Sequence, residues 1–451
     1  MTIDRRRFGL SLAALAFGGL AARAGGATPR VTGFGALRHD PAEMLDLPSG
    51  FSYRIISRRG DAMDDGLRVP DNADGMGAFA IDARRIALVR NHELSARALR
   101  HGASPRTGTG VANAYDRNGS GRALPGGTTT LVYDTVTGTV TQQYLSLAGT
   151  IRNCAGGTTP WGSWLSCEED MTLAGHDVGK DHGWVFEVPA AQQGLADPRP
   201  LTAMGRFNHE AAAVDPATGI VYMTEDRDDG LFYRFLPDVR GALARGGRLQ
   251  ALGLVAAAEG SDSRNRKSAD FGVGSGHRVT WIDLDDVKSP DDNLRQRGHR
   301  RGATRFARGE GVHFGRGELF FCCTSGGAAR LGQIMRYRPS RFEGQSGETA
   351  NPGTIALFVE STDKAHFNYG DNLTVAPNGH LIVCEDQYSE RVDNRLRGVT
   401  PAGALYDFGR LRWQTELAGA CFSPDGRILF VNVYSPARTL AITGAWAAFR
   451  T

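Results

Sequence analysis

The sequence lacks a long hydrophobic run beyond its first 25 residues, and it lacks a net charge outside that segment. A membrane-spanning helix needs about 20 consecutive apolar residues, so the sequence predicts no stable membrane anchor. Lysine and arginine total 52 against 49 aspartate and glutamate, and the formal surplus of +3 lies within the first 24 residues. The rest of the chain is neutral, which gives no electrostatic reason to expect nucleic-acid binding.

Cysteine is scarce, and its spacing matches no common metal motif. The six cysteines form no CxxC pair and the chain has no HExxH segment, so zinc alone is not indicated. Cys322 and Cys323 are adjacent, and a chain of 451 residues needs no disulfide staples. We therefore expect at least some of the thiols to be free.

The N-terminus has the features of an export signal. Residues 5–8 read Arg-Arg-Arg-Phe, an apolar segment covers residues 11–21, and residues 22–24 offer a small-residue cleavage site. Paired arginines before a short apolar region resemble a bacterial twin-arginine signal. We predict a signal peptide over residues 1–27, the twin-arginine export machinery as a partner, and a periplasmic or secreted protein.

A strand-turn-strand pattern recurs along the rest of the chain. The clearest copies are residues 208–226, 371–386 and 417–433, and looser copies are residues 75–93, 153–168 and 310–324. Six β-rich units without a long helical period predict an all-β fold, namely a six-bladed β-propeller with inserted loops between blades. An irregular β-sandwich and an open β-solenoid are the alternatives.

Glycine is abundant, as a propeller requires. It supplies 59 of 451 residues, about 13% against roughly 7% in average usage, and it suits tight turns and inner strands that crowd an axis. The longest inserted segment covers residues 238–305. We predict a single catalytic domain over residues 28–451, and a monomer, because a closed propeller leaves little unpaired strand edge.

Acidic residues gather at both ends of the repeated hairpins. In a propeller blade, the start of the first strand and the end of the second lie on the same face. The starts carry Asp74, Asn153, Glu210, Glu310 and Asp371, and the ends carry Glu93, Cys167 with Glu168, Glu225 with Asp226, and Glu385 with Asp386. So many carboxylates at one channel mouth would repel one another unless cations held them.

The mixed ligand set indicates more than one kind of metal. Carboxylates suit a hard ion such as calcium, whereas a thiolate requires a softer ion such as iron or zinc. Cys167 is flanked by acids, where its thiol would need a metal to ionise. Cys154, Cys322, Cys323 and Cys421 have apolar or small neighbours and are expected in the core, while Cys384 fits either environment.

Several ordered motifs resemble the PhoX-type alkaline phosphatases. They are the segments at residues 159–169 (Thr-Pro-Trp-Gly through Cys-Glu-Glu), 91–93, 207–210, 224–227, 308–311 and 384–386, together with the export signal. The resemblance spans roughly residues 40–440. It implies a six-bladed propeller, a site that holds calcium (Ca2+) and ferric iron (Fe3+) in one cluster, and hydrolysis of small phosphate monoesters at alkaline pH outside the cytoplasm.

The resemblance also implies roles for individual residues. Cys167 and Glu210 would ligate iron, and Glu168 would be the neighbour of Cys167 on the cluster. Glu310 would bridge to calcium, and Arg308 would hold the substrate phosphate and take part in catalysis. The remaining metal-site candidates, as calcium ligands or residues that support ligands, are Glu93, Asp226, Glu385 and Asp386, with Asp371 and Glu225 as further possibilities.

Two other function classes stay open at this stage. A calcium-dependent lactonase or sugar-acid hydrolase would need only hard ions and no cysteine. A non-catalytic propeller stabilised by calcium would bind a ligand or partner through one face. Iron together with calcium favours the phosphatase, calcium alone favours the lactonase, and metal without turnover favours the binding propeller.

Overall fold

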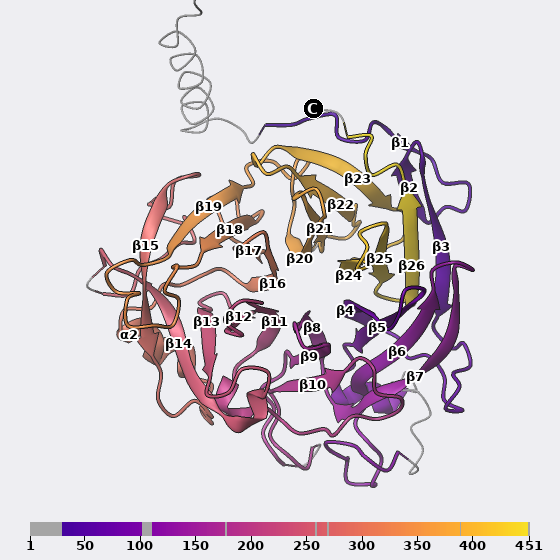
Figure 1. The fold of residues 1–451 in the computed structure, drawn as a ribbon, viewed down its shortest axis with the longest axis horizontal. Coiled ribbons are helices and arrows are strands. Elements are labelled where there is room, and N and C mark those ends of the chain that lie inside the picture. The colour runs from indigo at the N-terminus through magenta and orange to yellow at the C-terminus, as the bar shows by residue number, and fades with distance from the viewer. Residues whose placement is uncertain are drawn as a thin grey trace, which may run out of the picture.

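The computed structural model describes residues 29–101, 111–175, 178–257, 259–267, 270–387 and 389–449. The export signal predicted over residues 1–27 lies outside these ranges. Within them, strands dominate, and no helix is both long and apolar enough to cross a membrane. The strands are arranged as an all-β, propeller-like ring of sheets (Figure 1).

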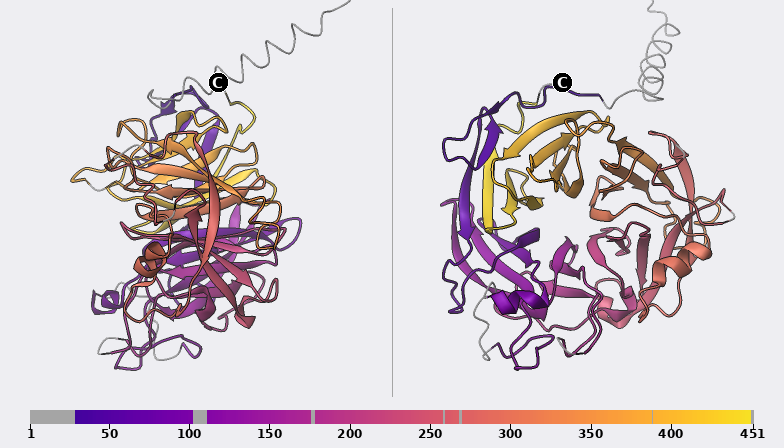
Figure 2. Two further views of the ribbon diagram at one scale, coloured as in Figure 1. Left: turned by 90° about the vertical axis from the view of Figure 1, so that its left-hand side faces the viewer. Right: turned by 180° about the vertical axis from the view of Figure 1, so that it is seen from behind.

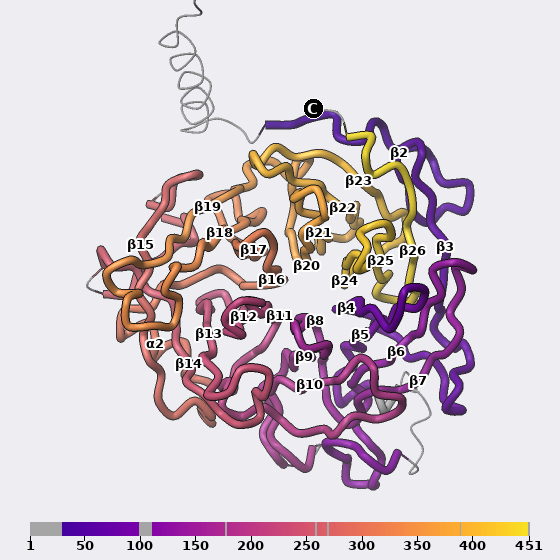
Figure 3. Tube along the Cα trace, viewed as in Figure 1, coloured from indigo at the N-terminus to yellow at the C-terminus, as the bar shows by residue number. Residues whose placement is uncertain are grey.

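The chain travels once around the ring, from β4 to β26, as the colour sequence of the trace shows (Figure 3). The first half contains β4 (Ala73–Ala80), β5 (Arg85–His92), β6 (Gly126–Asp134), β7 (Thr139–Thr150), β8 (Asn153–Thr158), β9 (Ser163–Glu168), β10 (Val185–Pro189), β11 (His209–Val214), β12 (Val221–Glu225), β13 (Phe232–Pro237), β14 (Gly247–Leu254) and β15 (Gly276–Asp283). The second half contains β16 (Gly309–Gly315), β17 (Glu318–Cys323), β18 (Gln333–Arg338), β19 (Thr354–Glu360), β20 (Gly370–Val375), β21 (Leu381–Glu385), β22 (Arg395–Val399), β23 (Leu405–Leu411), β24 (Leu417–Phe422), β25 (Ile428–Val433) and β26 (Arg438–Gly444). Short helices are η1 (Ala96–His101), η2 (Thr202–Met204), η3 (Leu243–Arg245) and α2 (Leu294–Arg300).

Within each sheet the strands follow one another in antiparallel order from the axis outward. The innermost strands β4, β8, β11, β16, β20 and β24 contact one another in sequence, and β24 contacts β4 again, so the inner ring is closed. Figure 2 shows this ring from the side and from behind. Second strands such as β12, β21 and β25 are almost fully buried because sheets cover them on both faces.

The apolar core lies between neighbouring sheets. Phe232 of β13 stacks on Phe321 of β17, with ring centroids 4.3 Å apart and planes only 4° from parallel. Both side chains are completely buried in a cluster that joins two successive groups of strands. Burial of aromatic rings on this scale dominates the energetics of a core, so the ring is held by contacts between sheets as well as by hydrogen bonds within them.

Segments from the two ends of the described chain complete the ring. The N-terminal strands are β1 (Leu37–Arg38), β2 (Leu45–Pro48) and β3 (Phe51–Arg58). β3 pairs along β26, and β2 pairs with β23. The outermost positions of the last two sheets are therefore taken by N-terminal strands, and these pairings close the ring without a covalent link.

The segment over residues 238–305 is an extension of the sheets. It contributes η3, β14, β15 and α2, with β14 paired to β13 and β15 paired to β14. β15 also pairs with β19, so β11–β19 form one nine-stranded sheet. The described strands consequently form five hydrogen-bonded sheets, because this insertion bridges two groups that the repeat pattern treats as separate blades.

Candidate metal centre

The inner strands share a β-bulge near their first residues, and this bulge positions the site. In β4, β8, β11, β16 and β20 the pairing register shifts directly after the first residue of the strand. A bulge leaves its extra residues unpaired and redirects a side chain. The second residue of each strand is Asp74, Cys154, Glu210, Glu310 and Asp371, respectively, and all five line one cavity.

Glycine or alanine follows four of these five residues and allows the bulged strands to approach one another. A Cβ added to Gly75 would lie 2.5 Å from the Cα of Ala155, and one added to Gly311 would lie 2.7 Å from the Cα of Asn372. Both positions therefore require glycine because neighbouring inner strands occupy the space of a side chain. In β24, Gly419 (φ +60°) lies within the bulge, and the acid comes from Glu416 just before the strand.

The residue that follows each of several second strands also enters the cavity. Glu93, Glu169, Asp226 and Asp386 directly follow β5, β9, β12 and β21 and line the same space. The cavity has a volume of about 710 Å³. Its further polar lining residues are Asn72, Ser95, Arg97, Arg152, Arg308 and Tyr434.

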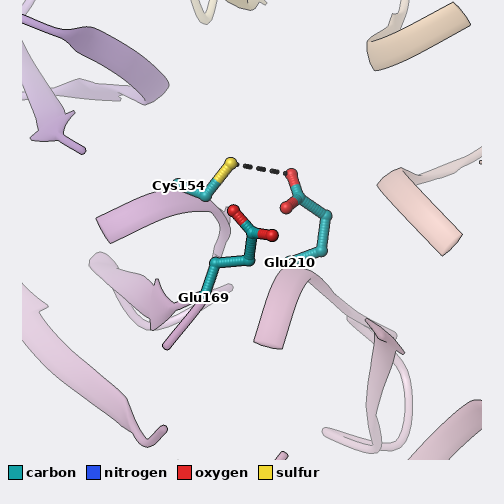
Figure 4. Close-up of side chains that lie close together, drawn as sticks. All are labelled: Cys154, Glu169 and Glu210. Atoms are coloured by element: carbon teal, nitrogen blue, oxygen red, sulfur yellow. Dashed lines mark hydrogen bonds between the residues drawn. The ribbon is translucent and has the colours of Figure 1, made fainter. Parts of the chain in front are cut away.

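Three overlapping groups of ligand atoms lie at the centre of this cavity. They are Cys154 with Glu169 and Glu210, Glu210 with Glu310 and Asp371, and Asp371 with Asp386 and Glu416. Within each group the candidate ligand atoms lie within 4.8 Å of one another. The Cys154 thiol is 3.1 Å from Oε1 of Glu210 and 3.6 Å from Oδ2 of Asp74. Figure 4 shows Cys154, Glu169 and Glu210 turned toward a common point.

The electrostatics of the cavity favour bound cations. Burial, followed by repulsion from neighbouring acids, raises the pKa of Asp74, Glu210 and Glu310 well above the ordinary range. The same causes raise the pKa of Asp371 to about 7. Oδ1 of Asp74 and Oε2 of Glu210 are buried without a hydrogen-bond partner. Buried unpartnered carboxylate oxygens are costly, and a cation would satisfy them.

The donor set fits a mixture of hard and soft ions. Burial and the charges of Asp74 and Glu210 raise the pKa of the Cys154 thiol well above its usual value, so this thiol ionises only beside a cation. A thiolate suits a softer metal such as iron, while the surrounding carboxylates suit calcium. The residues present therefore fit a metal cluster of the kind that the resemblance implies.

Arginines surround the acids and neutralise part of their charge. Arg308 holds Asp226 through a two-point contact of 2.7 and 2.9 Å and lies 3.0 Å from Glu310. Arg152 bonds Glu93 at 2.7 Å and also pairs with Glu169. Arg97 lies on η1 at the exposed side of the cavity.

Three polar residues of the cavity lining share an uncommon backbone conformation. Asn72, Arg152 and Arg308 each directly precede an inner strand, and each has a positive φ, of 51°, 45° and 53°. Left-handed backbone at residues other than glycine costs free energy and clusters at functional sites. The turns into β4, β8 and β16 thus direct an amide or guanidinium group into the cavity.

The structure brings six of the predicted site residues together and places three elsewhere. Glu93, Glu210, Asp226, Arg308, Glu310 and Asp386 line the cavity. Cys167, Glu168 and Glu385 do not. Cys167 is completely buried in an apolar cluster with Met204 and Phe207. Glu168 and Glu385 are also completely buried and bind groups behind the cavity wall.

Sequence reasoning expected Cys154 in the core and therefore missed the cavity cysteine. Cys154 occupies the position in β8 that Asp74 occupies in β4 and Glu210 in β11. Alignment of the repeat on the first residue of each inner strand would have found it. Glu169, Glu416 and Tyr434 were also missed as members of the site.

A propeller-like ring with carboxylates, a thiol and arginines around one axial cavity defines a protein of β-propeller architecture with a candidate metal site. The family model described as "Alkaline phosphatase PhoX" matches residues 32–437. The chain belongs to this phosphatase family.

Several solved structures match the chain, and the first of them shows the likeness of the fold. PhoX from Pseudomonas fluorescens, determined in complex with vanadate, a transition state analogue, is 19% identical, with 94% of this chain and 98% of that chain covered and a TM-score of 0.65. A protein of unknown function from Dyadobacter fermentans is 10% identical, with 88% and 100% covered and a TM-score of 0.44. A gluconolactonase from Xanthomonas campestris is 13% identical, with 94% and 98% covered and a TM-score of 0.37. No curated protein sequence matches the chain.

Proposed function

We propose that this phosphatase hydrolyses small phosphate monoesters in the axial cavity with calcium and ferric iron held there together. The observation that carries the proposal is the convergence of three overlapping ligand groups on one space beside Arg308. Membership of the PhoX family supports the reaction type. The thiol of Cys154 within the acid cluster supports iron in addition to calcium.

The proposed ligand set follows the observed cavity. Cys154, Glu169 and Glu210 form the group with a soft donor and would hold iron. The all-carboxylate groups, Glu210 with Glu310 and Asp371 and Asp371 with Asp386 and Glu416, would hold calcium. The iron-ligand role expected for Cys167 therefore passes to Cys154, and the role expected for Glu168 passes to Glu169. Glu93 and Asp226 would orient the arginines.

Arg308 is proposed to bind and orient the substrate phosphate. Its guanidinium can donate two parallel hydrogen bonds to phosphoryl oxygens, and the contact with Asp226 holds the side chain in place before substrate arrives. When bound, the cations supply positive charge that offsets negative charge on the phosphoryl group. Arg308 adds a fixed donor to the same group.

We propose a six-bladed propeller over residues 28–451 as the single catalytic domain. Six inner strands, β4, β8, β11, β16, β20 and β24, support this count. In this description β11–β15 and β16–β19 are two blades joined along β15 and β19. The segment over residues 238–305 would then supply the outer strands of one blade together with α2.

Export and oligomeric state are proposed from the sequence. Residues 1–27 would direct the folded protein through the twin-arginine machinery to the periplasm or the exterior, and the mature protein would be a monomer. Replacing both Arg5 and Arg6 with lysine should leave the protein in the cytoplasm, as measured by cell fractionation. Export at the wild-type level would refute the assignment. Light scattering on the purified protein tests the monomer.

The activity test combines metal analysis with turnover. Hydrolysis of p-nitrophenyl phosphate at alkaline pH should be present in the metal-loaded protein, lost with chelator and restored by reloading. Elemental analysis should find iron together with calcium. Absence of turnover in protein that contains both metals would refute the proposal. Calcium alone with lactone hydrolysis would indicate a lactonase, and metal without any turnover would indicate a binding propeller.

A further inference from the structure

Three second strands end in a pair of acidic residues, and the two members of each pair face different environments. The pairs are Glu168-Glu169, Glu225-Asp226 and Glu385-Asp386, at the ends of β9, β12 and β21. The second member of each pair lines the cavity. The first member is completely buried and lies outside the cavity lining.

The carboxylate of Glu168 is surrounded by donors. Its Oε1 accepts from the backbone N–H of Ile151 at 3.0 Å and lies 2.6 Å from Nδ1 of His182. Its Oε2 accepts from the backbone N–H groups of Gly183 and Trp184 at 3.0 and 3.2 Å. Both oxygens therefore have hydrogen-bond partners within the protein, so no metal is needed to satisfy this carboxylate.

His182 extends the contact to a second loop. Its Nε2 lies 3.2 Å from Oδ2 of Asp116, and Asp116 in turn accepts from the backbone N–H groups of Gly179 and Lys180 at 2.8 and 3.0 Å. The imidazole is completely buried between the two carboxylates. The end of β9 is thus fixed to the loop after it and to the segment around residue 116.

The corresponding first acids are also held by buried donors, each through one of its two oxygens. Glu225 accepts from the Tyr233 hydroxyl at 2.7 Å and from the N–H of Leu231 at 3.2 Å. Glu385 accepts from Nε of Arg397 at 2.7 Å and from the N–H of Asn368 at 2.9 Å. Each of Glu168, Glu225 and Glu385 pairs with the first residue of the adjacent inner strand, so the three positions are equivalent in the repeat.

We propose that Glu168 is a positioning residue that fixes Glu169 for metal binding. Consecutive residues at a strand end point to opposite sides, so the anchored Glu168 sets the backbone from which Glu169 reaches Cys154 and Glu210. Loss of the anchor frees the end of β9 and weakens the ligand group. This inference rests on the proposed metal-dependent function, and its test reads metal binding separately from catalysis.

The variant Glu168→Gln keeps the size of the side chain and removes its charge. Groups that orient metal ligands typically alter metal affinity by about 10–100-fold when they are replaced. We expect the affinity for iron, measured by competition with a chelator and elemental analysis, to fall by at least about 10-fold. In protein loaded fully with both metals, the KM for p-nitrophenyl phosphate should stay near wild type because Arg308 is unchanged.

Glu343→Gln is the matched control. Glu343 is a buried glutamate that accepts from Arg234 at 2.7 Å, Tyr337 at 2.8 Å and Tyr222 at 3.0 Å, and it does not line the cavity. Its replacement also removes a buried charge and should lower the melting temperature while leaving the iron affinity unchanged. Equal shifts of metal affinity in both variants would mean that Glu168 affects metal binding only through the stability of the fold. That result would overturn the inference.

A second variant decides the question if Glu168→Gln does not fold. Asp116→Asn weakens the outer contact to His182, together with the contacts of Asp116 to the N–H groups of Gly179 and Lys180, and should lower iron affinity by a smaller factor. Unchanged iron affinity in Glu168→Gln would overturn the positioning role while the phosphatase stands, and if Glu168→Gln does not fold, unchanged iron affinity in Asp116→Asn would do the same. A wild-type protein that binds no metal would overturn both proposals.

Discussion

Removal of the metals should make the stability of this protein fall steeply as the pH rises. Burial and the charge of Asp386 raise the pKa of Asp371 from 3.8 to about 7. Between these two pKa values the folded protein holds a proton that the unfolded chain has released. Stability therefore decreases with rising pH through this window, unless bound cations favour the ionised carboxylate.

The size of this loss of stability follows from the pKa shift of Asp371. Each pKa unit corresponds to about 1.4 kcal/mol, so Asp371 alone destabilises the metal-free protein by ~4 kcal/mol at pH 8 relative to pH 4. The entropy of unfolding is about 2.1 cal/mol/K per residue, or about 0.9 kcal/mol/K for a domain of this length. The melting temperature in chelator should consequently fall by about 5 °C from this residue, and the other raised acids of the cavity add to that decrease.

The assay is a melting curve recorded between pH 4 and 8, once in chelator and once in excess calcium. His182, whose pKa its acidic neighbours hold at about 9 against the penalty of burial, contributes equally to both series, so their difference reports the cavity. Asp371→Asn should flatten the slope in chelator and raise the melting temperature of the metal-free protein at pH 8. A melting temperature in chelator that is constant or rises with pH would refute the reasoning.

Five substitutions at four positions test the remaining assignments. Arg308→Ala should raise the KM for phosphate monoesters by about 10- to 100-fold through loss of a charge-assisted two-point contact, and Arg308→Lys should restore little of it; an unaltered KM would count against this role. Cys154→Ser should lower the bound iron, whereas Cys167→Ala should retain it at a stability cost of ~1 kcal/mol for a small cavity, and elemental analysis separates the two. Gly311→Ala should destabilise the protein by about 1–3 kcal/mol in denaturant unfolding because its methyl would meet the neighbouring inner strand.

The repeat in the sequence was sufficient to predict an all-β, propeller-like fold, because each hairpin carries its own turn and apolar strands. It could not predict that β14 and β15 would bridge two groups of strands. That segment has no copy elsewhere in the chain, and the pairing of β15 with β19 joins residues far apart in the sequence.

Within the site, the sequence was a good guide to which strand ends matter and a poor guide to which side chain enters the cavity. A shift of one residue moves a side chain to the opposite face of a strand. Glu168 therefore faces away from the cavity although its neighbour Glu169 lines it, and Cys167, which still lies inside β9, packs in the core. The bulge after Asn153 turns Cys154 toward the acids, and single-sequence periodicity carries no sign of that bulge.

The contact between β24 and β4, which closes the inner ring, has a consequence for the order in which the protein assembles. The carbonyl of Asp74 on β4 accepts from the side chain of Asn432 on β25, and Gly419 packs closely against it. Cavity acids come from positions as distant as Asp74 and Glu416, and β3 has its partner only when β26 is present. The complete cavity thus forms only after nearly the whole chain has been synthesised, so a full metal complement reports that folding is finished. Under the proposed export of the folded protein, metal loading would then distinguish finished chains from partial ones before they cross the membrane.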